Sequence, residues 1–186
     1  MPVPIGASGS GQWYNKRTLI EQLQHHDITW TPRRHALIVA CDSWTDPRNV
    51  GMAFRLADAF GVGELWLGGS TPAPPNQKLN RAARSSQRWQ PYRMVPEFVP
   101  ALLAAQQAGS VLIGLEITDK SQPLAQLSVL RQRAEQPILV VGAERAGIRK
   151  EVLEILDYCV HIEMHGRNSS LNVATALGIA LYEWNR

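Results

Sequence analysis

A segment in the first third of the chain carries two polar side chains whose spacing suits chemistry near a phosphate. It reads DPRNVGMAFRLADAFGV, from Asp46 to Val62. Asn49 falls in the first turn of the helix that this pattern predicts, and Arg55 follows six residues later, about 9 Å along the axis. The apolar face of the helix does not need Arg55, so its guanidinium can project into a site and bind phosphate. A solvated helix with an ordinary surface arginine fits the same pattern.

A second segment, GAERAG from Gly142 to Gly147, places one carboxylate, Glu144, directly after an expected buried strand. It lacks the G-x-G-x-x-G spacing of a dinucleotide site. It begins like a phosphate loop, but Ile148 and Arg149 stand where that loop needs Lys and Ser or Thr. What remains is a turn at the end of a strand, which either presents Glu144 to a site or exposes it to solvent.

A third segment, HGRNSSLNVATALGIALYEW, predicts a turn followed by a helix that starts near Ser169 or Ser170. Ser170 and Asn172 would lie in the first turn, beside backbone N–H groups that have no partner within the helix. These two side chains could contact a ligand or could serve as caps only.

A basic stretch lies between the first two segments, and no Asp or Glu occurs from Leu65 to Pro96. Its cations recur at three- and four-residue steps, which predicts one face of a helix over about 78–87, and Trp89 could stack on a base. The pattern is typical of binding to a phosphate backbone, although a solvated helix face also fits. The candidate nucleic-acid-binding residues are Lys78, Arg81, Arg84 and Arg88.

Apolar runs and helical patterns alternate along the chain, which predicts an α/β fold with a mostly parallel sheet flanked by helices. Residues 1–34 would form an N-terminal extension, mobile over residues 1–12, and residues 35–186 would form one domain. The polar segments follow expected strand ends, so they should meet at the carboxyl edge of the sheet. The expected strands are 35–41, 64–67, 92–95, 110–117, 138–141 and 160–164. The expected helices are 18–26, 47–60, 78–87, 96–108 and the C-terminal one, with a loop or weak helix over 124–133.

Composition limits the possible classes of protein. The 186 residues carry a net charge of +3 and are 45% hydrophobic, which is typical of a globular domain and permits an anionic partner. No apolar run reaches the roughly 18 residues of a membrane span, and no signal peptide is evident. Two distant cysteines favour a reduced, cytoplasmic protein. The five histidines show no metal-ligand spacing, so no metal is expected. Because no apolar run is long enough to span a membrane, no membrane partner is expected either.

Taken together, three motifs resemble the SpoU/TrmH class of SPOUT methyltransferases, which methylate ribose 2′-hydroxyls of RNA. They occur in order as DPRNVGMAFRLADAFGV, VVGAERAGI and IEMHGRNSSLNVATALGIALY, and the resemblance covers about Ala36 to Trp184. It implies that the domain over 35–186 is a SPOUT methyltransferase domain, whose C-terminal segment forms a deep trefoil knot. It also implies S-adenosylmethionine as cofactor, a tRNA or rRNA substrate, and a homodimer with active sites at the subunit interface.

The resemblance also assigns residues by motif match. Arg55 is the proposed base of the family, but a guanidinium is not readily deprotonated. Arg55 would therefore either accept the ribose proton with help from a substrate phosphate, or stabilise the alkoxide while water takes the proton. The implied cofactor contacts are Gly142, Ile162, Leu171 and, nearby, Met164. The implied catalytic positions are Asn49, Arg55, Glu144, Ser170 and Asn172.

Three other classes compete with this interpretation. A non-catalytic RNA-binding or ribosome-assembly protein could retain the same fold, but the intact Asn49, Arg55, Glu144 and Asn172 argue against it. A SPOUT enzyme of another branch would methylate a base nitrogen instead, whereas the SLN motif favours ribose. A nicotinamide-dependent oxidoreductase is disfavoured by the missing glycine fingerprint.

Overall fold

The computed structural model describes residues 21–24, 27–29 and 31–186 of the chain. The chain divides into two compact units, Met1–Arg33 and Arg34–Arg186. In the first unit the backbone N–H of Gln24 donates to the Asp27 carboxylate at 2.8 Å. The predicted mobility of residues 1–12 lies outside the described residues, and the predicted helix over 18–26 is not formed at residues 21–24, the longest part of it that the structure describes. The second unit contains the sheet and the helices that position the candidate site.

The centre of the second unit is a seven-stranded sheet with the order β3-β2-β1-β6-β4-β7-β5. Every neighbouring pair is parallel, so the predicted parallel sheet is confirmed. The two-residue strand β5 was not predicted, because so short an element leaves no periodicity in the sequence. The strands are β1 (Ile38–Asp42), β2 (Glu64–Gly68), β3 (Tyr92–Val95), β4 (Val111–Leu115), β5 (Gln122–Pro123), β6 (Pro137–Val141) and β7 (Tyr158–His161).

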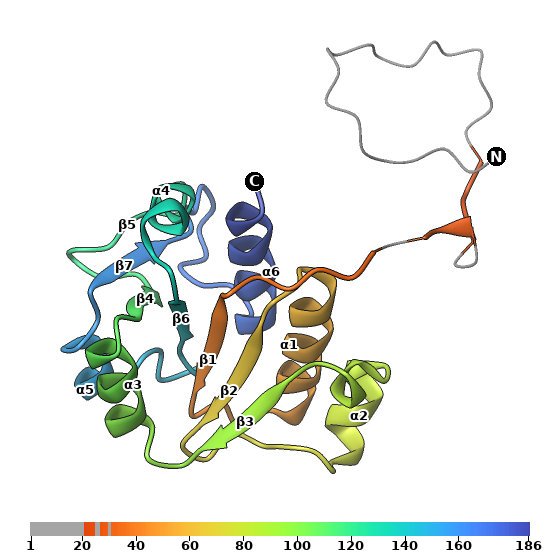
Figure 1. Cartoon of the computed structure of the whole chain (residues 1–186). Helices are drawn as coiled ribbons and strands as arrows, with labels where there is room; N and C mark the ends of the chain where they lie inside the picture. Colours follow the sequence, from red (N-terminus) through yellow and green to blue (C-terminus); the bar gives the residue numbers. More distant parts are fainter. Residues whose placement is uncertain (1–20, 25–26, 30) are drawn as a thin grey trace, which may run out of the picture. The chain divides into compact units, whose positions relative to one another are not determined.

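Helices cover both faces of this sheet, with α1 and α6 on one side and α3 and α5 on the other (Figure 1). Successive residues of β1 therefore enter different cores: Val39 and Cys41 pack with α1 and α6, and Ala40 packs with α3. A strand buried on both faces must be apolar throughout, which explains the continuous runs seen in the sequence. The helices are α1 (Pro47–Ala59), α2 (Gln77–Ala83), α3 (Phe98–Gln107), α4 (Gln126–Arg133), α5 (Lys150–Leu153) and α6 (Val173–Trp184).

The predicted start of α1 is confirmed in detail. Asp46 is the N-cap, its carboxylate accepts from the Arg48 backbone N–H at 2.8 Å, and Pro47 follows at the first helical position. Proline suits that position because its missing N–H would have no partner within the helix. This cap fixes where α1 leaves the end of β1, and so fixes the direction in which Asn49 and Arg55 project.

Two predicted boundaries near the C-terminus are wrong. Strand β7 ends at His161, so Ile162 and Met164 lie beyond the strand, in the loop that leads to α6. Helix α6 begins at Val173 rather than near Ser169 or Ser170. Asn172 is its N-cap, and its side-chain oxygen accepts from the backbone N–H groups of Ala174 and Thr175. Ser, Thr and Asn are all good caps, so the sequence alone did not decide among them.

The strand order creates a place for a ligand. The chain runs outward from β1 through β2 to β3, crosses to β4, and then returns to insert β6 between β1 and β4. The loops after β1 and β6 therefore begin side by side at the carboxyl edge. The chain after β1 continues towards β2, and the chain after β6 continues in the opposite direction, towards β7. In open α/β sheets, ligands bind in the crevice at such a switch in strand order.

Candidate active site

Two cavities open at the carboxyl edge of the sheet. The first, here called the β7 cavity, has a volume of about 530 Å³ and is lined by residues that follow β4, β6 and β7. All four sequence-predicted cofactor residues line it: Gly142, Ile162, Met164 and Leu171. Glu144 and Ser170 line it as well. The structure thus brings together residues from two motifs that are separated by some twenty positions in the chain.

The second, here called the α1 cavity, has a volume of about 690 Å³ and is lined by the β1–α1 loop, the start of α1 and the loop after β6. It contains three of the predicted catalytic residues, Asn49, Glu144 and Asn172. The Asn49 amide donates a hydrogen bond to Oε1 of Glu144. The Asn172 amide donates to Oδ1 of Asn49 at 3.2 Å. One residue from each of the three motifs is therefore joined in a single chain of hydrogen bonds.

A small hairpin separates the two cavities, since residues 143–147 line both. It is closed by an antiparallel bridge in which Ala143 and Gly147 exchange backbone hydrogen bonds of 3.0 and 2.9 Å. Gly142 precedes the hairpin, and any Cβ at this position would overlap the Gly147 carbonyl group. Gly147 has φ +65°, a backbone conformation that favours glycine, so both positions need glycine. The two glycines of the motif therefore build the shared wall that carries Glu144.

Ser170 lies outside helix α6, in the loop before its N-cap, and lines the β7 cavity. The expectation that it occupies the first turn of the helix is therefore wrong. The loop backbone around Ser170 is not committed to helical hydrogen bonds, and Leu171 beside it is 38% exposed. This segment can present backbone groups and an apolar side chain to a ligand in the β7 cavity.

Arg55 lies on the exposed side of α1 and lines neither cavity. Within the part of the chain that the structure describes, no hydrogen bond or ion pair involves its guanidinium. The geometry of one chain therefore joins Asn49, Glu144 and Asn172 and leaves Arg55 apart from them, with an unpaired charge on the surface.

The predicted basic helix is shorter than expected. Helix α2 ends at Ala83, because Arg84 and Ser85 adopt left-handed conformations with φ 49° and 77°, and the turn Ser86–Arg88 follows. All four candidate RNA-binding residues are nevertheless exposed, and none has a carboxylate partner among the described residues. Trp89 is 53% exposed beside them. We call this set, Lys78, Arg81, Arg84, Arg88 and Trp89, the basic surface.

One cation of the basic surface, Lys78, acts on a residue that lines the α1 cavity. The side-chain and backbone N–H groups of Arg48 hold the pKa of Asp46 below its usual value, and the charge of Lys78 lowers it further. Asp46 lines the α1 cavity, and Lys78 is near enough for its charge to act on the Asp46 carboxylate.

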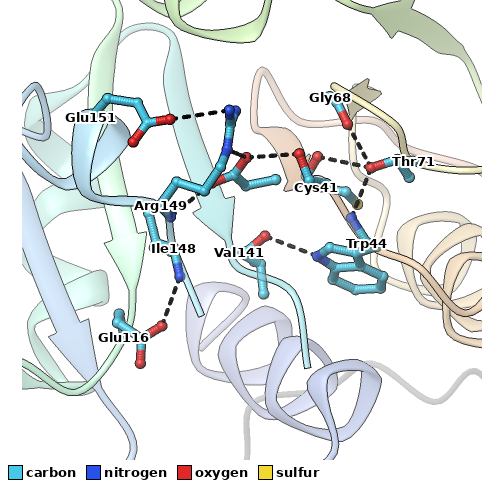
Figure 2. A network of polar contacts seen from close by, with 11 residues as sticks. Cys41, Trp44, Gly68, Thr71, Glu116, Val141, Ile148, Arg149 and Glu151 are labelled. Carbon is cyan, nitrogen blue, oxygen red and sulfur yellow. Dashed lines mark hydrogen bonds and ion pairs between the residues drawn. The ribbon is translucent and has the colours of Figure 1, made fainter. Parts of the chain in front are cut away.

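Two carboxylates that hold the end of the hairpin in place were not predicted from the sequence; Figure 2 shows one of them, Glu116, beside Ile148. Asp42, at the end of β1, is fully buried and pairs with Arg149 at 2.7 Å. Glu116, just after β4, accepts from the Ile148 backbone N–H at 3.0 Å. A carboxylate directly after a buried strand was the available signal, but nothing in the sequence indicated its partner.

The thiols are not poised for chemistry in this geometry. Burial raises the pKa of Cys41, which lies within β1. Burial also raises the pKa of Cys159, whose thiol donates to the Glu116 backbone carbonyl at 3.4 Å. Over the described residues, no group of three or more His, Cys, Asp or Glu side chains could hold a metal ion, and no helix is long and apolar enough to cross a membrane.

Comparison with known proteins defines the class. The model of the SpoU rRNA methylase family matches residues 36–182, so the chain belongs to this family. The chain is 30% identical over 166 residues to the 23S rRNA (guanosine-2′-O-)-methyltransferase RlmB of Vibrio parahaemolyticus, and the match covers 88% of this chain. It spans only 65% of the length of that relative.

Solved structures agree with this assignment. The A. aeolicus TrmH/SpoU tRNA modifying enzyme matches with a TM-score of 0.73 and 28% identity, over 83% of this chain and 76% of that one. The SpoU methyltransferase AviRb from Streptomyces viridochromogenes, solved in complex with AdoMet, matches with a TM-score of 0.70 and 30% identity, over 83% and 61% of the two chains. The predicted fold class, the α/β fold of the knotted SPOUT methyltransferases, is therefore confirmed.

Proposed function

We propose that this chain is an S-adenosylmethionine-dependent methyltransferase that modifies a ribose 2′-hydroxyl of tRNA or rRNA. The observation that carries the proposal is the hairpin that forms a wall between the two cavities and carries Glu144. Asn49 donates a hydrogen bond to Glu144, and Asn172 donates one to Asn49. Two neighbouring cavities with one polar wall suit a transfer between two bound molecules. The printed names of the relatives add the reaction and the RNA substrates.

The β7 cavity fits the cofactor. Its volume lies within the range of small-molecule sites, about 300 to 1,000 Å³. Its walls combine apolar side chains such as Leu115 and Ile162 with backbone groups of the loops after β6 and β7, which suit an adenosine moiety. Two carboxylates, Glu116 and Glu144, also line it and suit a positively charged sulfonium. We propose Gly142, Ile162, Met164 and Leu171 as cofactor contacts.

When bound, S-adenosylmethionine supplies an electrophilic methyl group; the chain supplies position and electrostatics. Asn172 and Asn49 hold the Glu144 carboxylate at the wall between the cavities. Arg55 keeps its charge and binds a phosphate next to the target ribose, where it stabilises the developing alkoxide while water takes the proton. Ser170 shapes the β7 cavity between cofactor and substrate. In these roles Asn49, Arg55, Glu144, Ser170 and Asn172 are the proposed catalytic residues.

The basic surface is the proposed RNA-binding surface. Its four cations lack carboxylate partners among the described residues, so their charge is available to phosphates. Its position near Asp46 would deliver a nucleotide to the α1 cavity. Lys78, Arg81, Arg84 and Arg88 would bind the backbone and Trp89 would stack on an unpaired base.

We also propose a homodimer in a reduced, cytoplasmic setting. Helix α6 packs on α1 and leaves Ile179 and Tyr182 exposed by 38% and 63% on its outer side. A second copy of the chain would cover this apolar side and bring an Arg55 side chain near a substrate held by its partner. Both cysteines are free, which suits a reducing compartment.

The proposal is tested with purified protein, S-adenosylmethionine carrying a labelled methyl group, and total tRNA and rRNA from cells that lack the protein. Ribose methylation protects the adjacent phosphodiester, so label should appear in nuclease-resistant dinucleotides. Label in single nucleosides after complete digestion would instead indicate base methylation. Calorimetry with S-adenosylmethionine identifies a third outcome. A protein that binds RNA, binds no cofactor and transfers no label would be a non-catalytic RNA-binding protein.

A further inference from the structure

The Gly142–Arg149 loop is held at both of its ends by the end of β1 and the loop that follows it. At its start, the indole N–H of Trp44 donates to the Val141 carbonyl at 2.9 Å. At its end, the Asp42 carboxylate accepts from the Arg149 backbone N–H at 3.0 Å and from the Arg149 Nε at 2.7 Å. Figure 2 shows the Trp44 indole directed at the Val141 carbonyl. The segment that begins α1 and the segment that carries Glu144 are therefore fixed to each other.

The two residues that hold the loop from the β1 side, Asp42 and Trp44, are buried, and Trp44 is hydrogen-bonded to Thr71. Asp42 and Trp44 are both 0% exposed. The Trp44 backbone N–H donates to the Thr71 hydroxyl at 3.0 Å, and that hydroxyl donates to the Gly68 carbonyl at 2.7 Å (Figure 2). A buried carboxylate is strongly unfavourable without a charged partner, so the pair of Asp42 with Arg149 determines where the loop ends.

A second carboxylate holds the same loop from the opposite side. Glu116 accepts from the Ile148 backbone N–H through Oε2 and from the Ile117 backbone N–H through Oε1, both at 3.0 Å. Glu116 lines the β7 cavity and not the α1 cavity. Asp42 and Arg149 line the α1 cavity and not the β7 cavity. The two carboxylates thus hold adjacent residues of the loop, 148 and 149, from the two sides of the wall.

We infer that Asp42 is a positioning residue for methyl transfer: through Arg149 it holds the Gly142–Arg149 loop so that Glu144 stays against Asn49. Glu116 plays the corresponding part on the cofactor side. The inference rests on the proposed function. It assigns different consequences to the two carboxylates, because losing Asp42 disturbs the α1 face of the wall while the Ile148 bond to Glu116 still supports the β7 face.

The test compares Asp42→Asn and Arg149→Lys with Glu116→Gln. An Asn at position 42 can accept from only one of the two Arg149 donors. A Lys at position 149 keeps the backbone bond to Asp42 and loses the Nε bond. We expect both variants to lower kcat at saturating cofactor and RNA by about tenfold or more, because small displacements of reacting groups cost up to about 100-fold. Their calorimetric affinity for S-adenosylmethionine should stay within about threefold of the starting protein.

Glu116→Gln should show the reverse pattern. Its cofactor affinity should fall about tenfold, the effect expected for one lost charged hydrogen bond, with kcat at saturation within about threefold. Glu151→Gln is the matched control, since it removes an exposed carboxylate that contacts the same Arg149 at 3.3 Å without touching the hairpin. This control should leave both quantities unchanged.

Backbone hydrogen exchange gives a measurement that does not depend on activity. In the protein without ligand, the amides of Ala143 and Gly147 should exchange faster in Asp42→Asn and Arg149→Lys than in Glu151→Gln. Thermal unfolding identifies variants that do not fold; if Asp42→Asn fails, Arg149→Lys decides, because its side chain is 35% exposed and its backbone bond remains.

Folded Arg149→Lys with unchanged kcat and unchanged exchange would overturn the inference. So would equal losses of kcat and cofactor affinity in Asp42→Asn and Glu116→Gln. A starting protein that binds no S-adenosylmethionine would instead contradict the proposed function, so the two failures are distinguishable.

Discussion

The Asn49 amide donates a hydrogen bond to the Glu144 carboxylate across 95 positions of sequence. The direction of this bond is set from the far end of the chain. Asn172 uses its side-chain oxygen to cap α6, so its amide nitrogen must point outward, and it donates to Oδ1 of Asn49 at 3.2 Å. With its oxygen occupied, Asn49 turns its own nitrogen towards Glu144. A helix cap thereby determines which group faces the carboxylate.

Asn172→Asp separates the cap from this orienting role. Aspartate caps a helix as well as asparagine does, so thermal stability should be nearly unchanged. It cannot donate to Asn49, and Asn49 would lose the contact that orients its amide. We expect turnover to fall by about tenfold or more, measured with labelled cofactor.

Asn172→Ala is the companion variant. It should lose turnover and also about 0.5 to 2 kcal/mol of stability, because the cap is removed. If Asn172→Asp methylates RNA at the original rate, the hydrogen-bond chain from Asn172 to Glu144 has no part in the reaction.

Arg55→Ala tests the charge on the exposed side of α1. Arg55 lines neither cavity, so S-adenosylmethionine affinity should be unchanged within about twofold in calorimetry, while turnover should be largely lost. Arg55→Lys keeps the charge and loses bidentate phosphate binding, so it should recover only part of the rate. Arg133→Ala, on α4, controls for the loss of an exposed cation. Near-normal turnover by Arg55→Ala would remove Arg55 from the mechanism.

Much of the fold could be predicted because local signals agreed with tertiary structure. Strand β6 is buried at every residue, and its continuous apolar run predicted such a strand. The Asp46-Pro47 pair marked the start of α1 correctly. The parallel sheet followed from the alternation of such runs with helical patterns, and the motifs located the residues that line both cavities.

The remaining features depend on partners distant in sequence. Asp42 and Arg149 pair across 107 positions, and no local pattern connects them. The four-residue helix α5 is too short to show a period. The Asn172 cap of α6 contacts Asn49, 123 positions away in the sequence, and α2 ends at Ala83 before two left-handed residues that are not glycine.

Charge reversal on the basic surface should weaken RNA binding. In Arg81→Glu with Arg84→Glu, each lost phosphate contact should reduce the slope of log K against log salt concentration by about 0.7 to 0.9. Both side chains are exposed and lack carboxylate partners among the described residues, so folding should be unaffected. Arg133→Glu carries the same type of change on α4 and should leave the slope unchanged. Equal slopes for all variants would make the basic surface an ordinary solvated face.

Asp46 should give a pH-dependent contribution to stability. Hydrogen bonds from Arg48 hold its pKa below the unfolded value of about 3.9, so the folded state favours the charged form. That contribution is complete above the unfolded pKa and is lost as pH falls through the folded pKa. Asp46→Asn keeps a cap that does not titrate. The difference in melting temperature between the two proteins should be constant above about pH 5 and shrink at lower pH. A constant difference down to pH 2 would contradict this.

Gly51 sets the distance between α1, which carries Asn49, and α2, which carries Lys78 and Arg81 of the basic surface. A Cβ at Gly51 would overlap the Leu79 carbonyl oxygen and lie 2.7 Å from the Ala82 Cβ, so α1 and α2 touch backbone to backbone. Gly51→Ala should therefore cost about 1 to 3 kcal/mol, as overpacking does. It should also weaken RNA binding, because α2 must move away from the α1 cavity, with cofactor affinity unchanged. Gly166→Ala is the control, since its Cβ would meet no atom within 4 Å. Denaturant unfolding and RNA titration measure both effects, and equal stability of the two variants would show that the helices separate without strain.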